Sequence, residues 1–275
     1  MRIVITGSSS GIGRALAERF LAHGHEVWGL ARSDQADMAA RHGNTFHATR
    51  CDVAEWAQVE RAAAEVGAAW PHVDGLVCCA GLQGEIGRAV TADPVRWSAT
   101  VRANLDGTFF AIRAFHPALH RAPRRAKLVC FSGGGASKAR PNFSAYGAAK
   151  TAIVRLVETI AEEEQGTALD INAIAPGAVS TRMTDEIVAA GLAAAGETEY
   201  QAAVRLKKAD GASLERALDL VEWLLSPASD GISGRLISAV WDPWPMLDRQ
   251  RDGLTGSDIY TLRRITPEER GQKWS

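Results

Sequence analysis

Tyr146 and Lys150 are separated by one helical turn in the stretch SAYGAAK. This spacing predicts that both side chains lie on one face of a helix, which Ser144 or Asn142 could cap. A lysine ammonium group beside a phenol favours the phenolate, so it lowers the tyrosine pKa from its ordinary value of about 10 toward neutral pH. Such a tyrosine can donate a proton to a carbonyl oxygen or accept one from an alcohol. The spacing is common by chance, so this interpretation depends on the elements that carry the pair.

Those elements alternate between short apolar runs and longer helical patterns, such as 94–120, 144–165 and 213–225. The runs RIVITG, VDGLVCCAG and LDINAIAPG are continuously apolar rather than alternating, as expected of strands buried on both faces of a parallel sheet. Repeated strand-helix units predict an α/β fold, a Rossmann-type doubly wound sheet of about seven parallel strands in a single domain. Residues 1–244 form this predicted domain, and 245–275 form a polar C-terminal extension.

The charge balance limits the class of partner. Lys plus Arg number 31 and Asp plus Glu number 32, for a net charge of -1, so no basic field is available for nucleic acid or an anionic membrane. A small neutral or locally anionic molecule is the expected partner. The chain opens directly on a strand pattern and contains no long apolar run, which favours a soluble, cytoplasmic protein.

Neither the cysteines nor the histidines indicate a metal site. The cysteines lie in or beside apolar runs without CxxC spacing, so we expect buried free thiols at Cys51, Cys78, Cys79 and Cys130. The seven histidines show no HxxxH-with-Glu arrangement of a zinc helix, so no metal is expected.

A glycine-rich turn, TGSSSGIG at residues 6–13, stands between the first strand and the first helix. Gly7 permits the tight turn, Gly11 and Gly13 let a phosphate approach the backbone, and the helix N-terminus favours an anion. The turn therefore predicts a dinucleotide site, with contacts from Gly7, Ser9, Ser10, Gly11, Ile12 and Gly13.

The end of the second strand indicates which dinucleotide the site binds. An acidic residue there would bind both ribose hydroxyls of NAD, but the sequence has Ala31 followed by Arg32. A guanidinium favours a 2'-phosphate, so NADP is predicted as the cofactor, with Arg32 as a contact. The alternative is that Arg32 is solvated and Asp34 turns in to bind NAD.

Taken together, these motifs resemble the short-chain dehydrogenase/reductase family over about residues 1–240. Further motifs carry the resemblance: Asp52-Val53 after the third strand, Cys78-Cys79-Ala80-Gly81 after the fourth, Asn104 in NLDG, and Pro176-Gly177 with Thr181 in PGAVST. The resemblance implies an oxidoreductase that interconverts a secondary alcohol and a ketone by hydride transfer with NAD(P), with Tyr146 as general acid/base. Lys150 would also bind the nicotinamide ribose.

The resemblance implies roles for other residues. Asp52 would bind the adenine amino group with Val53 beside the ring, and Asn104 would hold a water that relays protons to Lys150 and Tyr146. The remaining implied cofactor contacts are Ala80, Gly81, Pro176, Gly177, Val179 and Thr181. Residues 182–212 would form a substrate lid.

The resemblance also implies a homotetramer or homodimer. The helices that carry Asn104 and Tyr146 would pack against their symmetry mates. The loosely patterned lid segment contains the basic residues Arg205, Lys207 and Lys208. We expect them to lie on a solvated helix face; the alternative is that they bind a phosphate group of the substrate.

Two departures from the family pattern concern the active site. The usual asparagine pair before Ala-Gly is Cys78-Cys79, which leaves the glycine path intact. The fifth strand should end in two serines, the second of which bonds the substrate carbonyl, but aligning KLVCFSG places Ser132 first and Gly133 second. Ser132 is the favoured replacement, and the alternatives are Ser144, the substrate itself or a backbone N–H. Equally, the glycine run at 133–135 could leave room for a bulky substrate ring against the nicotinamide.

A third departure follows the last strand, where WDPWP replaces the usual glycines. Trp241 and Trp244 either cap the substrate pocket or pack against the core or a neighbouring subunit.

Two other functions remain open at this stage. One is a redox-neutral sugar or cyclitol epimerase. The other is a non-catalytic dinucleotide-binding regulatory protein, which the intact Tyr146, Lys150 and Asn104 argue against.

Overall fold

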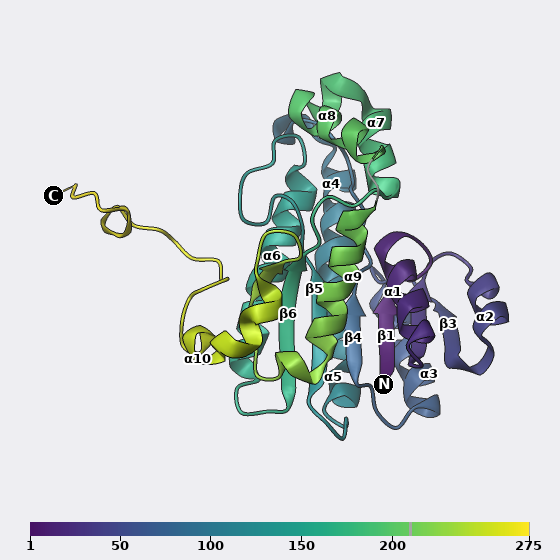
Figure 1. Cartoon of the computed structure of the whole chain (residues 1–275). Coiled ribbons are helices and arrows are strands. Elements are labelled where there is room, and N and C mark those ends of the chain that lie inside the picture. Colours follow the sequence, from purple (N-terminus) through teal and green to yellow (C-terminus); the bar gives the residue numbers. More distant parts are fainter. Residues whose placement is uncertain (209–210, 275) are drawn as a thin grey trace.

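Seven parallel strands form the centre of the molecule, in the order β3-β2-β1-β4-β5-β6-β7 (Figure 1). The computed structural model describes residues 1–208 and 211–274; Ala209 and Asp210 of the predicted lid, and Ser275 of the predicted extension, lie outside the described residues. The strands are β1 (Arg2–Thr6), β2 (Glu26–Ala31), β3 (Phe46–Arg50), β4 (Gly75–Cys78), β5 (Ala126–Phe131), β6 (Leu169–Ala175) and β7 (Leu236–Ser238). This confirms the predicted doubly wound α/β fold.

Helices cover both faces of the sheet. They are α1 (Gly11–Ala22), α2 (Ala36–His42), α3 (Trp56–Ala69), α4 (Pro94–Val101), α5 (Gly107–Leu119), α6 (Ser144–Glu163), α7 (Arg182–Ala195), α8 (Glu197–Leu206), α9 (Ala212–Leu225) and α10 (Arg251–Leu254). Figure 1 shows α1 and α9 in front of the sheet.

Successive strand residues enter different cores because side chains alternate across a sheet. Val4 and Leu128 pack with residues of α3, α5 and α6 on one face. Ile3 and Ile5 pack with residues of α1 and α9 on the other. Burial on both faces explains why the strand sequences are continuously apolar.

The strand order reverses beside β1, which pairs with β2 on one side and β4 on the other. The connections from β1 and β4 therefore leave in opposite directions and open a crevice at the carboxyl ends of these strands. This is where an open α/β sheet binds its ligand.

The helical pattern at 94–120 is not one regular helix. The Asp93 side chain caps the N-terminus of α4 by accepting from the N–H groups of Val95 and Arg96, and a π-helical turn at Arg102–Asp106 then separates α4 from α5. A π-turn adds a residue to the helix and is frequent at functional sites. It holds Asn104, which is fully buried.

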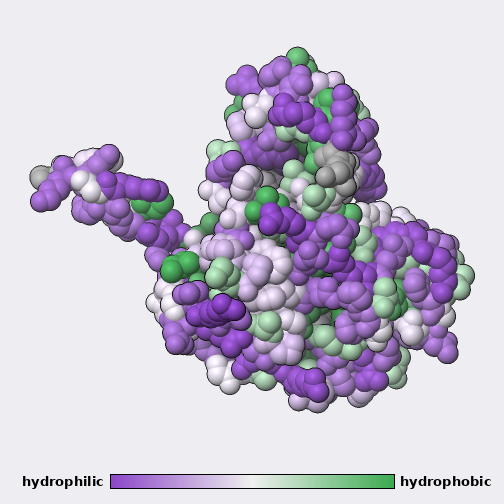
Figure 2. All heavy atoms as spheres, in the orientation of Figure 1, coloured by the Kyte–Doolittle hydropathy of each residue, from purple (hydrophilic) through white to green (hydrophobic). Residues whose placement is uncertain are grey.

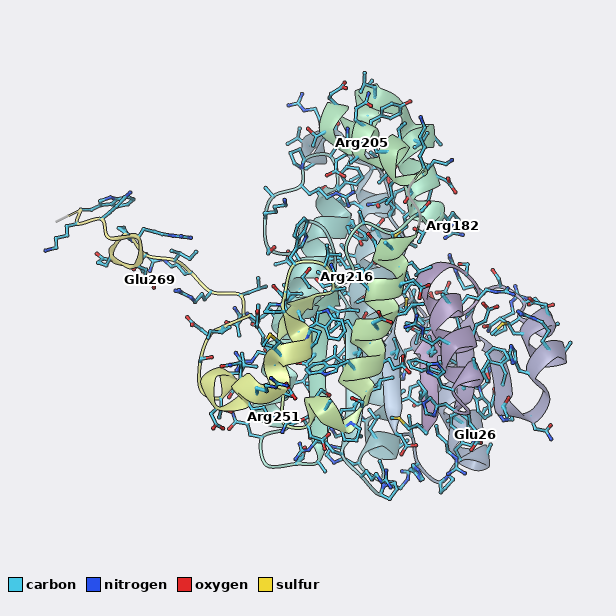
Figure 3. The ribbon with its side chains drawn as sticks, viewed as in Figure 1. Glu26, Arg182, Arg205, Arg216, Arg251 and Glu269 are labelled. Atoms are coloured by element: carbon cyan, nitrogen blue, oxygen red, sulfur yellow. The ribbon has the colours of Figure 1, made fainter. Side chains whose placement is uncertain are left out.

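Two segments lie outside the sheet and its covering helices. Helices α7 and α8 form a lobe above the carboxyl ends of the strands (Figures 1 and 2). Arg205 of α8 is exposed at the top of this lobe (Figure 3), and Lys207 pairs with Asp185 at 2.8 Å. The basic residues of this segment that the structure describes thus lie on a solvated surface.

The C-terminal extension divides into two parts. Arg235 donates hydrogen bonds to the carbonyls of Leu254, Ser257 and Ile259, and Arg251 donates to the carbonyl of Ala228, so the first part is fixed to the body (Figure 3). The part beyond residue 262 projects away from it (Figures 1 and 2).

Two further features concern membrane-spanning helices and the cysteines. In the part of the chain that is described, no helix combines the length and apolar character needed to cross a membrane. All four cysteines are free thiols, and Cys79 alone among them is not fully buried.

Candidate active site

A cleft of about 1370 Å³ opens at the carboxyl ends of the strands. It lies below the α7–α8 lobe and reaches from the glycine-rich turn to the start of α6. The predicted site residues that line it are Gly7, Ser9, Ser10, Gly11, Ile12, Gly13, Arg32, Asp52, Val53, Ala80, Gly81, Ser132, Tyr146, Lys150, Pro176, Gly177, Val179 and Thr181. The fold thus brings residues from seven separate segments of the chain to one cleft, whereas the predicted site residue Asn104 is not among the lining residues.

The glycine-rich turn depends on close backbone packing. A Cβ atom at Gly7 would lie 2.8 Å from the Cα of Ala80, and one at Gly13 would lie 2.4 Å from the carbonyl oxygen of Gly7. Gly13 is therefore required for packing helix α1 onto the turn, which is a different reason from the phosphate approach expected from the sequence. Gly11, with φ of 54°, lines the cleft, and a Cβ atom there would lie 3.5 Å from Thr181 Cγ2.

The end of β2 presents a cation to the cleft. Arg32 is exposed and lines the cleft, and its carbonyl accepts from Arg50 Nε at 3.1 Å. The Asp34 carboxylate instead accepts from the backbone N–H of Ala36 at 2.8 Å, at the start of α2. The carboxylate that could have turned in to bind a ribose is thus engaged elsewhere.

Tyr146 is 9% exposed and lies next to Gly133. A Cβ atom at Gly133 would lie 2.7 Å from the tyrosine hydroxyl. The residue that replaces the expected serine is therefore directly beside the phenol, as the gap-free alignment requires.

Burial raises the pKa of Tyr146 above its ordinary value, with the positive charge of Arg140 opposing the shift and Cys79 adding to it. The sequence predicted the opposite direction from Lys150 alone. The difference arises because removing a phenolate from water costs more than nearby cations recover. Lys150 lies over the ring, with Nζ 5.5 Å from its centroid, rather than against the hydroxyl.

Lys150 is anchored beneath the tyrosine. Its Nζ donates to the carbonyl of Phe131 at 2.8 Å, and burial lowers its pKa to about 8, with the neighbouring thiols opposing the shift. An amine with this pKa exchanges protons readily near neutral pH.

Asn104 lies behind Lys150. Its Nδ2 donates to the carbonyls of Leu82 at 3.0 Å and Thr100 at 2.9 Å. Its Oδ1 is buried without a partner among the described residues. A Cβ atom at Gly81 would lie 2.6 Å from this oxygen and 3.5 Å from Lys150 Nζ, so both atoms face the same small space. An unpaired buried acceptor beside an amine is suited to holding a water.

The two serine hydroxyls that could replace the hydroxyl missing at Gly133 already form hydrogen bonds within the protein. Ser132 Oγ donates to the carbonyl of Lys150 at 3.0 Å, and Ser144 Oγ accepts from Trp97 Nε1 at 3.1 Å. Among the described residues, the N–H groups of Gly133 and Gly134 have no acceptor. Both glycines line the cleft.

The cleft also contains residues that the sequence did not single out. Arg140 packs over Phe143, with its guanidinium carbon 3.9 Å from the ring centroid, and pairs with Glu199 of α8 at 2.7 Å. Gln83 is buried and its Nε2 has no partner among the described residues. Tyr260 lines the cleft from the extension. Gln83 is the second residue after the Cys-Cys-Ala-Gly motif, so its position gave a signal; the other two depend on folding of distant segments.

The two tryptophans after β7 take different positions. Trp241 is 84% exposed at the rim of the cleft, whereas Trp244 packs against Trp223 with ring centroids 5.9 Å apart. Between them, Asp242 accepts from the Ser238 N–H at 2.6 Å, and burial raises its pKa. One tryptophan is therefore available to a ligand and the other is part of the core.

Comparisons with known proteins point to one family. A family model described as short chain dehydrogenase matches residues 1–191. A short chain dehydrogenase of Monascus purpureus is 30% identical over 268 residues, covering 94% of this chain and 86% of that protein. The galactitol 2-dehydrogenase (L-tagatose-forming) of Cereibacter sphaeroides is 35% identical over 184 residues, covering 66% of this chain and 72% of that protein.

Solved structures share the fold. A short chain dehydrogenase/reductase of Saccharomyces cerevisiae aligns with a TM-score of 0.80 at 23% identity, covering 88% of this chain and 97% of that chain. A short chain dehydrogenase of Shigella flexneri complexed with NADP aligns with a TM-score of 0.74 at 25% identity, covering 86% and 96%.

Proposed function

Because the chain belongs to the short-chain dehydrogenase family, and is therefore an oxidoreductase acting on small molecules of the alcohol or ketone type, we propose that it interconverts a secondary alcohol and a ketone with NADP, using Tyr146 as general acid/base. The observation that carries this proposal is the arrangement of Tyr146 and Lys150 in one cleft, with the unpaired Asn104 Oδ1 buried behind Lys150. When bound, the nicotinamide cofactor supplies or accepts the hydride.

The cleft fits a dinucleotide. The backbone of the Gly7–Gly13 turn and the N-terminus of α1 would hold the pyrophosphate, and Asp52 with Val53 would hold the adenine. Arg32 favours NADP because it lines the cleft and its guanidinium could pair with a 2'-phosphate, while Asp34 Oδ1 accepts from Ala36 at the start of α2. The NADP bound to the Shigella flexneri relative is in line with this preference.

Proton transfer would follow a short route. Tyr146 donates to the carbonyl oxygen in reduction and accepts from the alcohol in oxidation. Lys150, with a pKa lowered to about 8 by burial, would pass the proton onward beneath the cofactor ribose. Asn104 Oδ1 would hold the water that connects the amine with solvent. Since burial raises the Tyr146 pKa, its protonated form is the resting form at neutral pH.

The substrate carbonyl needs a second donor besides Tyr146. The free N–H groups of Gly133 and Gly134 line the cleft and are suited to this role. Ser132 would then hold α6 in position through the Lys150 carbonyl. A direct catalytic role for Ser132, as predicted from the sequence, requires that its hydroxyl leave that carbonyl.

The substrate would enter between the lid and the Trp241 rim. Arg140, Gln83 and Tyr260 add polar groups to a cleft that both polar and apolar residues line, which suits a polyhydroxylated or cyclic secondary alcohol. The similarity to a galactitol 2-dehydrogenase supports beginning with polyols.

The decisive experiment follows nicotinamide absorbance with NADP(H) and NAD(H) against polyols, cyclic alcohols and the corresponding ketones. Wild type is compared with Tyr146→Phe. We expect the variant to lose activity by about 10²–10⁴-fold while retaining cofactor affinity. Turnover that survives in Tyr146→Phe would refute the assignment of the acid/base, and cofactor binding without any Tyr146-dependent turnover would favour an epimerase or a regulatory protein.

We also propose that the protein assembles into a homodimer or homotetramer through α5 and α6. Phe109 of α5 is 44% exposed, and its ring is tilted against that of Phe110, with ring centroids 6.1 Å apart. Light scattering of wild type and Phe109→Ser tests this, since a monomer in both would exclude it.

A further inference from the structure

His116, His120 and Glu164 lie together at the carboxyl ends of two helices. His116 is in the last turn of α5, His120 is its C-cap, and Glu164 is the C-cap of α6. His116 Nε2 is 2.6 Å from one Glu164 carboxylate oxygen, His120 Nε2 is 3.0 Å from the other, and the two Nε2 atoms are 3.1 Å apart. Three good metal-ligand atoms thus converge on one point.

We propose that His116, His120 and Glu164 bind a divalent transition-metal ion, with Zn²⁺ as the best match. Imidazole nitrogen and carboxylate oxygen are ordinary zinc ligands. Bonds of 2.0–2.1 Å in a tetrahedral site place ligand atoms about 3.3 Å apart. The distances of 3.0 Å and 3.1 Å need only small adjustment, and the 2.6 Å contact must lengthen by a side-chain rotation.

The surroundings favour a cation at this point. Helix carboxyl ends carry partial negative charge, and both α5 and α6 end here. Thr167 Oγ1 donates to Glu164 Oε2 at 3.0 Å and orients the carboxylate, as outer partners of metal ligands commonly do. Arg125 donates to the carbonyl of Thr167, but its charge is balanced by Asp170 at 3.0 Å.

The cluster is accessible to an ion from solvent. The side chains of His116 and His120 are 38% and 34% exposed, and that of Glu164 is 12% exposed. Three protein ligands leave a fourth position for water. The pattern escaped the sequence analysis because a zinc helix carries its glutamate within the HxxxH segment, whereas here the glutamate comes from another helix.

The site would stabilise the fold rather than take part in the chemistry. It lies at the end of α6 opposite Tyr146, and a helix rising 1.5 Å per residue separates the two by about 27 Å. A metal would join the ends of α5 and α6. Without metal, His116 Nε2 hydrogen-bonds to Glu164 Oε1 and His120 Nε2 lies 3.0 Å from Oε2, so the carboxylate also holds the two imidazoles together in the metal-free protein.

The test uses full-length protein freed of metal by a chelator that is then removed. Zn²⁺ is titrated in competition with a chromophoric chelator, with Mg²⁺ and Ca²⁺ as oxygen-preferring controls. We expect one Zn²⁺ per chain, and a loss of at least about tenfold in affinity for His120→Ala and Glu164→Gln. His23→Ala is the matched control, because His23 also pairs with a glutamate, Glu222 at 2.5 Å, but has no second histidine on it. This control variant should bind Zn²⁺ with the same affinity as the wild type.

Two further measurements guard against misfolded variants and other ligands. Zn²⁺ should raise the Tm of wild type and His23→Ala but not of His120→Ala, while kcat of wild type stays unchanged. Co²⁺ bound to wild type should show d–d bands without thiolate charge transfer. Equal Zn²⁺ affinity in wild type and His120→Ala, a thiolate band, or equal stabilisation by Mg²⁺ would each overturn the proposal.

Discussion

The Tyr146 hydroxyl lies so close to Gly133 that a Cβ atom at position 133 would be 2.7 Å from the hydroxyl oxygen. The absence of a side chain at this position therefore defines where the phenol can sit. Gly133→Ala should displace Tyr146 and lower kcat at least about tenfold, because small misplacements of reacting groups are costly. The matched control is Gly134→Ala, whose Cβ would meet nothing closer than Arg140 Cδ at 3.7 Å. Equal kinetics in the two variants would show that Tyr146 adjusts freely.

Ser132 connects the end of β5 to α6 through its hydrogen bond to the Lys150 carbonyl. Ser132→Ala leaves this buried carbonyl without that donor, which should cost about 1 kcal/mol of unfolding free energy. We expect kcat to remain within about threefold. Urea unfolding and steady-state kinetics measure both quantities. A loss of about 10²-fold or more in kcat at unchanged stability would instead show that the hydroxyl acts on the substrate.

Arg32 should determine cofactor preference. Arg32→Ala should weaken NADP binding about tenfold or more and leave NAD binding nearly unchanged, since only NADP carries the 2'-phosphate. Fluorescence titration with each cofactor checks this. Arg41→Ala is the control, because Arg41 is another arginine of the same region that pairs with Glu18 at 2.9 Å outside the cleft. Equal weakening of both cofactors would remove the basis for NADP preference.

The ion pair between Arg140 and Glu199 joins the segment before α6 to the lid helix α8. Glu199→Gln should raise KM several-fold with a smaller effect on kcat, because a part-buried pair holds the lid over the cleft. Glu186→Gln removes an exposed i,i+4 pair with Arg182 on the same lobe and should change neither. If the two variants behave alike, the pair does not control the lid.

Lys150 should make stability depend on pH. Its pKa is lowered by burial from 10.5 to about 8, so between these values the unfolded chain holds a proton that the folded protein has released. The unfolding free energy of wild type relative to Lys150→Met should therefore rise with pH between about 8 and 10.5, by up to about 3 kcal/mol, and be flat below this range. Parallel pH profiles of the two proteins would contradict a lowered pKa.

Much of the site was open to prediction because its motifs are local. The glycine-rich turn and Asp52-Val53 lie within a few residues of a strand end, and the Tyr146–Lys150 pair lies within the first turns of the helix that follows β5. Strand order then brings these segments to one edge of the sheet. The fold was predicted correctly for the same reason, since continuous apolar runs report burial on both faces.

Other features could not be predicted from neighbouring residues. Position 13 must be glycine because a Cβ atom there would clash with the Gly7 carbonyl. The hydrogen bond that Asp34 accepts from Ala36 depends on where α2 begins. The direction of the Tyr146 pKa shift depends on complete burial, which no four-residue spacing reveals.

The sequence by itself determined the class of fold, the family and many of the residues that line the cleft, because strand patterns and short motifs depend on local chemistry. Only the tertiary structure decided which groups remain free to act. It engaged Ser132, Ser144 and Asp34, left Asn104 Oδ1 unpaired, and brought His120 to Glu164 from separate helices. The physical reason is that hydrogen bonding and burial of a side chain depend on segments that are distant in the chain and meet only on folding.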